Sequence, residues 1–118
     1  MYGVSADLDL SHFQEASCIQ IAIGEFQIQF HFCPTGSISV DGRWELRNPN
    51  GHVLDETMDN ENRVTYRIHQ LLGQTVRETF VNPPKSFGLR FENGCVLEVF
   101  DDSDQYESCQ IAPTGVII

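Results

Sequence analysis

The residues best suited to bind a partner form an acidic run near the carboxyl end of the chain. Asp101, Asp102 and Asp104 follow an apolar segment, and Glu107 comes shortly after them. The run does not fit a calcium loop of the EF-hand type, because that loop needs a glycine at its sixth position and a glutamate at its twelfth. Exposed carboxylates speed the approach of a basic partner. We therefore interpret this solvent-exposed turn as the best candidate docking site for a basic protein.

A second acidic group precedes a predicted helix. It contains Asp55, Glu56, Asp59 and Glu61. Carboxylates at a helix start offset the positive end of the helix dipole and contribute about 0.3–1 kcal/mol each. This ordinary structural role makes the second group a weaker candidate for partner binding than the run at 101–104.

Other residues with chemical potential do not form a recognisable site. Histidine occurs at His12, His31, His52 and His69. No two of these have metal-ligand spacing, and a zinc site would need further ligands from distant strands. Glu25 and His31 share the polar side of one predicted strand, but roughly 20 Å of extended chain separates them. No nucleophile elbow, P-loop or dinucleotide fingerprint is present, so we expect no enzyme, no metal and no cofactor.

Length and charge indicate one acidic domain, 1–118. A chain of 118 residues with 41% hydrophobic content can bury its own core. The 17 acidic and seven basic residues give a formal net charge of −10, which repels phosphate backbones and anionic membranes and favours basic partners. We expect no nucleic-acid binding, because seven scattered basic residues supply no footprint for phosphates. The apolar runs are too short to span a bilayer.

The amino-terminal residues and the cysteines indicate a cytoplasmic protein. The first residues contain no basic head followed by an apolar stretch, so we expect no secretory signal. The cysteines are widely spaced, at Cys18, Cys33, Cys95 and Cys109. A core of this size needs no disulfides, and we predict four free thiols.

Alternating residues predict β-strands in the first half. The clearest run places Phe26, Ile28, Phe30 and Phe32 on one buried face. Another run alternates at Ile19, Ile21 and Ile23. Gly24 separates the two runs, which therefore form a hairpin or a sharply bent strand. After the turn at 33–36, alternation resumes with Ile38 and Val40.

A further strand and turn follow. Trp44 and Leu46 share one face, and we predict that Trp44 is buried. Residues 48–51, Asn-Pro-Asn-Gly, favour a tight turn, because proline fixes one dihedral while asparagine and glycine tolerate positive φ. Pairing Leu46 with Val53 across this turn would set apolar opposite apolar.

The middle of the chain has helical spacing. Apolar residues recur at Val64, Ile68, Leu71 and Leu72. Gly73 is a glycine stop, so the pattern predicts one short amphipathic helix near Glu61–Leu72.

The second half returns to strands, predicted at Thr75–Val81, Ser86–Phe91, Val96–Phe100 and Ser108–Ile111. The turn at 92–94 allows two registers, and a three-residue loop with Gly94 left-handed buries one consistent face. This register sets Phe91 opposite Cys95, Leu89 opposite Leu97 and Phe87 opposite Val99.

Together these patterns predict a mainly β, antiparallel fold. We expect seven or eight strands, in a barrel or a sandwich, with one short helix between two hairpin blocks. The blocks FHF-CPTG-SISVDGRWEL and LRF-ENG-CVLEVFDDSDQYES follow the same order of strand, glycine turn, strand and acidic turn. A duplicated unit and chance similarity both account for this echo.

The segment Ser37–Ile111 resembles a family of small uncharacterised bacterial proteins. The likeness is carried by SISVDGRWELRNPNG, HQLLGQTV and LRFENGCVLEVFDDSDQYESCQI. In that family a G-x-W-x-L segment precedes an F-x-x-G-x-x-L-x-V-x-D-D-S-x-x-Y-E-S ending. Some members look like immunity partners encoded beside bacterial toxins. The resemblance implies a bacterial cytosolic source and no catalytic residues.

Three functions fit these observations. The first is a non-enzymatic protein-binding module, such as an immunity protein that neutralises a basic toxin. The second is a β-barrel that binds or transforms a small molecule in a cavity. The third is a subunit, including a homo-oligomeric one, that assembles through an exposed sheet edge. For the third, the apolar end 115–118 could add as a strand to another sheet.

Overall fold

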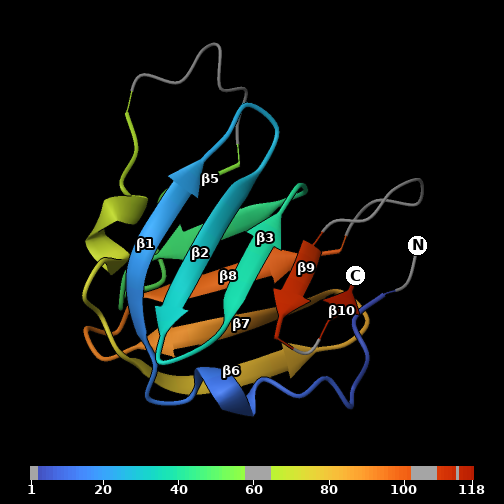
Figure 1. Ribbon diagram of the computed structural model, residues 1–118. Coiled ribbons are helices and arrows are strands. Elements are labelled where there is room, and N and C mark those ends of the chain that lie inside the picture. The colour runs from blue at the N-terminus through green and yellow to red at the C-terminus, as the bar shows by residue number, and fades with distance from the viewer. Residues whose placement is uncertain (1–2, 58–64, 102–108, 114) are drawn as a thin grey trace.

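The computed structural model of the chain describes residues 3–57, 65–101, 109–113 and 115–118. Its ten strands within these ranges form two five-stranded antiparallel sheets packed face to face (Figure 1). The strands are β1 (Ser17–Ile23), β2 (Ile28–Cys33), β3 (Ser37–Val40), β4 (Trp44–Arg47), β5 (Val53–Glu56), β6 (Val76–Asn82), β7 (Ser86–Phe91), β8 (Val96–Phe100), β9 (Cys109–Ala112) and β10 (Val116–Ile117).

The front sheet has the strand order β1-β2-β3-β9-β10, and the rear sheet has the order β5-β4-β8-β7-β6. The front strands cross the rear strands at a steep angle (Figure 1). The predicted antiparallel, mainly β fold is confirmed, as a sandwich rather than a closed barrel. The segment 115–118 does not extend to another sheet, because β10 pairs with β9 and Ile118 is buried.

Aromatic side chains from both sheets fill the core. Phe30 meets Trp44 edge to face, with ring centroids 6.3 Å apart, and Phe32 stacks on Phe91 at 6.5 Å. All four are buried, as predicted for Trp44, Phe30 and Phe32. Edge-to-face and offset arrangements stabilise aromatic pairs beyond the area they bury.

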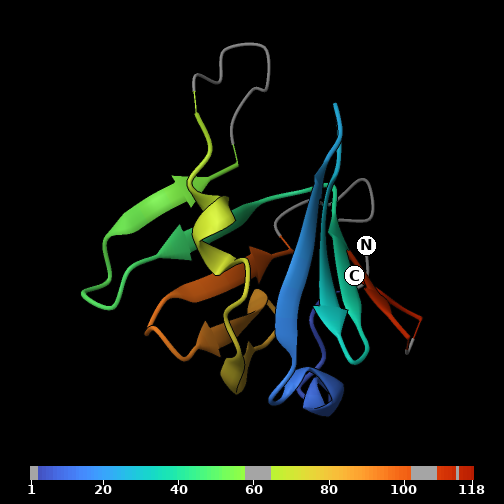
Figure 2. The same cartoon turned by 60° about the vertical axis from the view of Figure 1, so that its left-hand side comes forward.

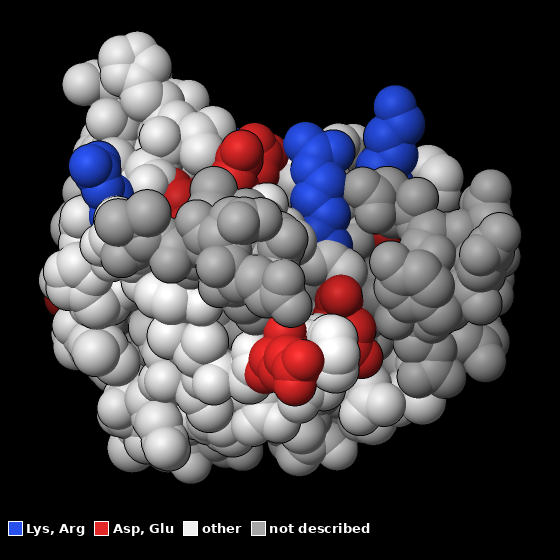
Figure 3. Space-filling model, turned by 90° about the horizontal axis from the view of Figure 1, so that it is seen from above, with Lys and Arg blue, Asp and Glu red and all other residues white. Residues whose placement is uncertain are grey.

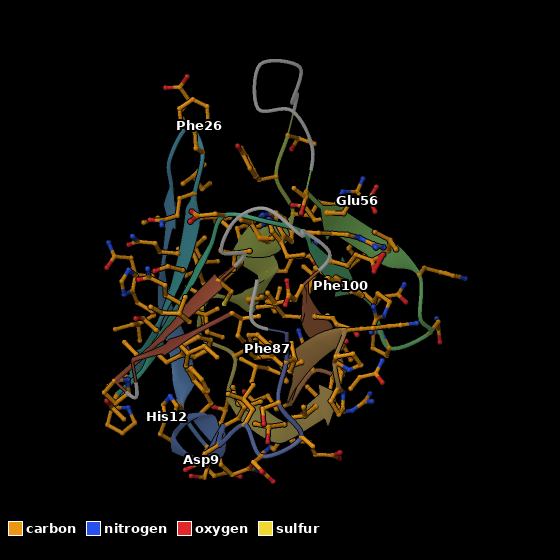
Figure 4. The ribbon with its side chains drawn as sticks, turned by 90° about the vertical axis from the view of Figure 1, so that its right-hand side faces the viewer. Asp9, His12, Phe26, Glu56, Phe87 and Phe100 are labelled. Atoms are coloured by element: carbon orange, nitrogen blue, oxygen red, sulfur yellow. The ribbon has the colours of Figure 1, made fainter. Side chains whose placement is uncertain are left out.

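Phe26 does not face this core, contrary to the prediction. The backbone N–H of Gly24 donates to the carbonyl of Gln27 at 2.7 Å, so the β1–β2 hairpin turns at Glu25 and Phe26. Phe26 is 81% exposed and lies at the tip of the hairpin, far from the buried Phe87 (Figure 4). The apolar alternation runs on into a turn that projects past the rear sheet (Figure 2).

The hairpin of β7 and β8 has the predicted register. Leu89 pairs with Leu97, and Phe87 with Val99. Gly94 has a φ of 88°, in the left-handed region that glycine adopts without strain. The choice of the register that buries one face is therefore confirmed.

The predicted pairing of Leu46 with Val53 is wrong. Leu46 lies opposite Asp55, and Arg47 lies opposite Val53, because the β4–β5 pair contains a bulge. Val53 is 47% exposed and Asp55 is buried. One extra residue in a strand moves the following side chains to the other face.

The predicted amphipathic helix near Glu61–Leu72 is also wrong where the structure describes it. Residues 61–64 lie outside the described ranges, Thr65–Arg67 are not helical, and Ile68–Leu71 form a single 3-10 turn, η3. Ile68 and Leu71 are buried as the spacing suggested, whereas Leu72 is 46% exposed. A similar turn, η1, spans Ser11–Phe13.

The two halves of the chain repeat one order of elements. In the first half, β1–β2–β3 lie in the front sheet and β4–β5 in the rear sheet. In the second half, β6–β7–β8 lie in the rear sheet and β9–β10 in the front sheet. A 3-10 turn precedes each half, η1 before β1 and η3 before β6. Each half therefore contributes three strands to one sheet and two to the other.

Local geometry repeats as well. Ser17 and Thr75 form an antiparallel bridge, and their hydroxyl oxygens lie 3.1 Å apart. Two residues before each, Glu15 and Gly73 have positive φ values of 64° and 82°. These matching positions make Ser17 and Thr75 equivalent, so that each later residue of β1 has a counterpart in β6.

The bulges coincide under this equivalence. The register shifts after Cys18 in β1 and after Val76 in β6, which makes Ile19 and Arg77 counterparts. The echoing sequence blocks fall on β2–β3–β4 and on β7–β8, in equivalent places. The repetition favours a duplicated unit over chance similarity.

Candidate interaction surface

Only one residue of the predicted docking turn lies in the described part of the chain. Asp101 follows β8, is partly exposed, and its N–H donates to the carbonyl of Lys85 at 2.8 Å. Asp102, Asp104 and Glu107 lie outside the described residues. Asp101 thus stands at the crossing from the rear sheet to the front sheet.

Asp41, at the equivalent crossing after β3, comes to the same region. Burial is the largest cause of the raised pKa of the Cys109 thiol, and the carboxylates of Asp41 and Asp101 raise that pKa further. Seen from above, the described surface carries acidic and basic side chains side by side (Figure 3). Its charge is therefore mixed, and the site predicted at 101–104 stays a prediction.

The second acidic group contains a structural residue. Asp55 is buried, and its Oδ2 accepts hydrogen bonds from the N–H groups of Arg67 at 2.6 Å and Ile68 at 3.1 Å. Its Oδ1 accepts one from the N–H of Glu56 at 2.9 Å. Asp55 therefore caps η3 from the neighbouring strand β5. Glu56 is exposed, and Asp59 and Glu61 lie outside the described residues.

A network of polar side chains that includes a carboxylate, a guanidinium and a hydroxyl lies on the outer face of the rear sheet. Glu98 accepts a bond from Arg47 at 2.7 Å on one oxygen and from the Ser86 hydroxyl at 2.5 Å on the other. Arg47 also approaches Glu45 at 3.5 Å. Both oxygens of Glu98 are engaged, so the network has the character of a structural link between β4, β7 and β8.

The histidines do not assemble into a metal site. Within the described residues, no group of three or more His, Cys, Asp or Glu side chains is placed to hold a metal ion. His12 lies against Phe13 at a centroid distance of 4.0 Å, beside Asp9 at the end opposite Phe26 (Figure 4). The Nε2 atom of His12 is buried and has no hydrogen-bond partner among the described residues.

The four cysteines form no disulfide, as predicted. Cys33 is exposed, and the other three are buried. Burial raises the pKa of the Cys18 thiol to about 11 and also raises the pKa of the Cys95 thiol. The buried thiols are therefore poor nucleophiles.

Among the described residues, the most exposed large apolar side chains lie on β1 and its hairpin. Ile19 is 60% exposed, Ile23 49% and Phe26 81%. β1 is the edge strand of the front sheet, and Figure 2 shows its tip rising beyond the rear sheet. Ser17–Ile23 contains no charged residue, although the protein carries a net charge of −10.

The backbone of β1 is open along the same edge. Antiparallel pairing turns successive residues alternately toward one neighbour and away from it. Because Gly24 bonds to Gln27, Ala22 faces β2, while Ile21 and Ile23 turn their N–H and C=O groups outward. At the other end of the strand, Cys18 is already engaged by Gln74 and Gly73. The free edge therefore starts after the bulge and ends at the hairpin turn.

The counterpart edge, β6, carries charge where β1 carries isoleucine. Arg77 pairs with Glu15 at 3.0 Å and with Glu92 at 3.4 Å. The side-chain amide of Gln14 donates to the carbonyl of Arg77. Charged side chains and covering segments are the usual means by which proteins guard a sheet edge.

The amino-terminal segment flanks β6 as well (Figure 1). It is held just beyond the far end of that strand, where the N–H of Val4 donates to the carbonyl of Pro84 at 3.0 Å. At the near end, the N–H of Glu15 donates to the carbonyl of Val76 at 2.9 Å. Under the equivalence of Ser17 with Thr75, the first-half residues Gln14, Ile19 and Ile21 correspond to Leu72, Arg77 and Thr79 in the second half.

Sequence reasoning identified the isoleucine alternation but did not predict that this strand lies at an open edge. The signal that could have indicated an open edge is the absence of charged residues from this strand. A half-exposed strand with no Lys, Glu or Asp in seven residues is unusual for an edge. The bulge at Ile19, which exposes that side chain, has no signature in the residues themselves.

Comparison with protein-family models, with curated proteins and with solved structures gave no match to this chain. The resemblance to small bacterial immunity-like proteins accordingly stays a prediction. In the described part of the chain, no helix has the length and apolar character needed to cross a membrane.

Proposed function

We propose that this chain is a non-enzymatic protein-binding module that binds through the edge of β1 and the tip of the β1–β2 hairpin. The observation that carries the proposal is the exposure of Ile19 and Ile23 on an edge strand with free backbone groups, together with that of Phe26 at the tip of its hairpin. Open edges accept a further strand from a partner.

The sharper form of the proposal is an immunity protein for a basic toxin. A net charge of −10 supports this form, since it accelerates association with a cationic partner. The predicted carboxylates at Asp101, Asp102, Asp104 and Glu107 would then contribute to the rate of encounter, and the exposed hairpin tip at Phe26 to the lifetime of the complex. A toxin gene beside the gene for this chain would support this form, whereas a metabolic operon would oppose it.

Photo-crosslinking in cells tests the binding surface. A photoreactive benzoylphenylalanine is placed at Phe26 in one variant and, as a control of similar polarity, at Val53 in another. Val53 is 47% exposed but lies on β5 of the rear sheet. We expect discrete protein adducts from position 26 and none from position 53. Equal labelling from both positions, or no adduct at position 26, would contradict the proposed surface.

A further inference from the structure

The open edge of β1 has features that select its partner. The seven residues Ser17–Ile23 are uncharged, so the strand offers no carboxylate to a basic segment. Two copies of the same strand, by contrast, bring no like charges together when they meet. This removes at the seam the repulsion that a net charge of −10 otherwise imposes on two copies of the protein.

The outward backbone groups are also self-complementary. Ile21 and Ile23 both face the open edge and are two residues apart. In an antiparallel pair of β1 strands, Ile21 of each copy can therefore lie opposite Ile23 of the other. All the outward N–H and C=O groups of these residues then find partners, and the twofold axis passes between the two Ala22 residues.

We infer that β1 pairs antiparallel with β1 of a second copy of this chain, joining two front sheets into one. This inference rests on the proposed function and names the partner of that same edge. The bulge at Ile19 limits the pairing on one side, and the turn at Gly24 limits it on the other. Because both copies use the same edge, the assembly closes as a symmetric dimer. The opposite edge of the sheet is only the two-residue strand β10.

The register provides a specific test by disulfide crosslinking. The background is Cys33→Ser, which removes the exposed cysteine. In the register centred on Ala22, the two Ala22 residues form a non-hydrogen-bonded pair with Cα atoms about 4.5 Å apart, within the reach of a disulfide. Ala22→Cys should therefore give a covalent dimer under mild oxidation.

Gln20→Cys is the matched control, because Gln20 lies on the same outer face of the same strand. In the centred register the two copies of residue 20 are about 13 Å apart, too far for a disulfide. A dimer from Ala22→Cys but not from Gln20→Cys is the expected result. Equal crosslinking of both variants would overturn the register, because random collision does not discriminate between them.

Sedimentation across about a hundredfold range of concentration separates this inference from the proposed function. We expect a reversible dimer that Ile23→Lys, at a half-exposed position of the open edge, abolishes and that Thr79→Lys on β6 leaves unchanged. A monomer at every concentration would overturn the second copy as partner. Adducts from Phe26 to another protein would then still support the binding surface, whereas their absence would remove both.

Discussion

β1 and β6 occupy equivalent places in the two halves of this molecule, yet they treat their open edges differently. Each is an edge strand, each begins beside a 3-10 turn, and each contains a bulge at the same position. The bulge of β6 presents Arg77, which is fixed by Glu15 and Glu92. The bulge of β1 presents Ile19, which is 60% exposed.

Because β1 and β6 have equivalent backbones, the differences between their side chains indicate what each strand contributes to the protein. Stability explains the apolar residues that point inward, and these are matched between the halves: Phe30 by Leu89, Ile38 by Leu97, Val40 by Val99. Stability does not explain isoleucines left at the surface of an edge. The comparison therefore assigns the core to folding and the edge of β1 to association.

The largest effects should come from the matched core. Phe30 and Leu89 are both fully buried, and we expect Phe30→Ala to cost about 3–5 kcal/mol and Leu89→Ala about 2–5 kcal/mol in the free energy of unfolding. Phe26→Ala should change it by less than about 0.5 kcal/mol, as for an exposed residue. Urea denaturation measures all three. A cost at Phe26 equal to that at Phe30 would mean that the hairpin tip is packed.

A second change replaces the polar residues at the bulge of β6 by the apolar residues found at the equivalent positions beside β1. The double substitution Gln14→Leu with Arg77→Ile removes one hydrogen bond and two exposed ion pairs. The hydrogen bond is worth about 0.5–1.5 kcal/mol, and exposed ion pairs add little. We expect this loss in stability together with new concentration-dependent association, seen by light scattering. An unchanged monomer–dimer balance would show that Gln14 and Arg77 do not prevent association through β6.

The reverse change, Leu72→Gln with Ile19→Arg, gives the edge of β1 the polar and charged side chains that occupy the equivalent positions beside β6. Both side chains are exposed, so stability should stay within about 0.5 kcal/mol of the original. Association through β1 should weaken, because a cation now stands at the open edge. Light scattering on the two double variants side by side checks both directions, and equal association of this variant and the original chain would refute the assignment.

The smallest effect concerns the thiol inside β1. Burial raises the pKa of Cys18 to about 11, so little thiolate forms at pH 8 and its alkylation should be slow. In the native protein Cys33 should react first, and after denaturation all four cysteines should react without reductant. Mass spectrometry of timed samples gives the order. Early labelling of Cys18 would indicate that β1 opens readily at the bulge.

The sequence predicted well those features that depend on local alternation. The strands Ser86–Phe91 and Val96–Phe100 and the register across Gly94 were all correct, because a buried face and a glycine turn specify them. The burial of Trp44 followed for the same reason. Features that depend on one inserted residue were missed, notably the bulge that moves Val53 outward and Asp55 inward.

The candidate surface could not be predicted because it depends on the order of strands. Ile19 and Phe26 belong to apolar patterns typical of buried strands, and only the position of β1 at a sheet edge leaves them exposed. The helical spacing that ends at Leu72 failed similarly. Ile68 and Leu71 needed a single turn to reach the core, and Asp55 supplied its cap from another strand.

The most direct test of the account is the exchange of backbone amide hydrogens with solvent, measured by NMR in dilute and in concentrated protein. The N–H groups of Ile21 and Ile23 face the open edge and should exchange fast in the dilute sample. We predict that their exchange slows as concentration rises, while that of Thr79 and Val81 on β6 does not change. Equal rates at both concentrations for Ile21 and Ile23, or slowing confined to β6, would contradict the assignment of the β1 edge to association.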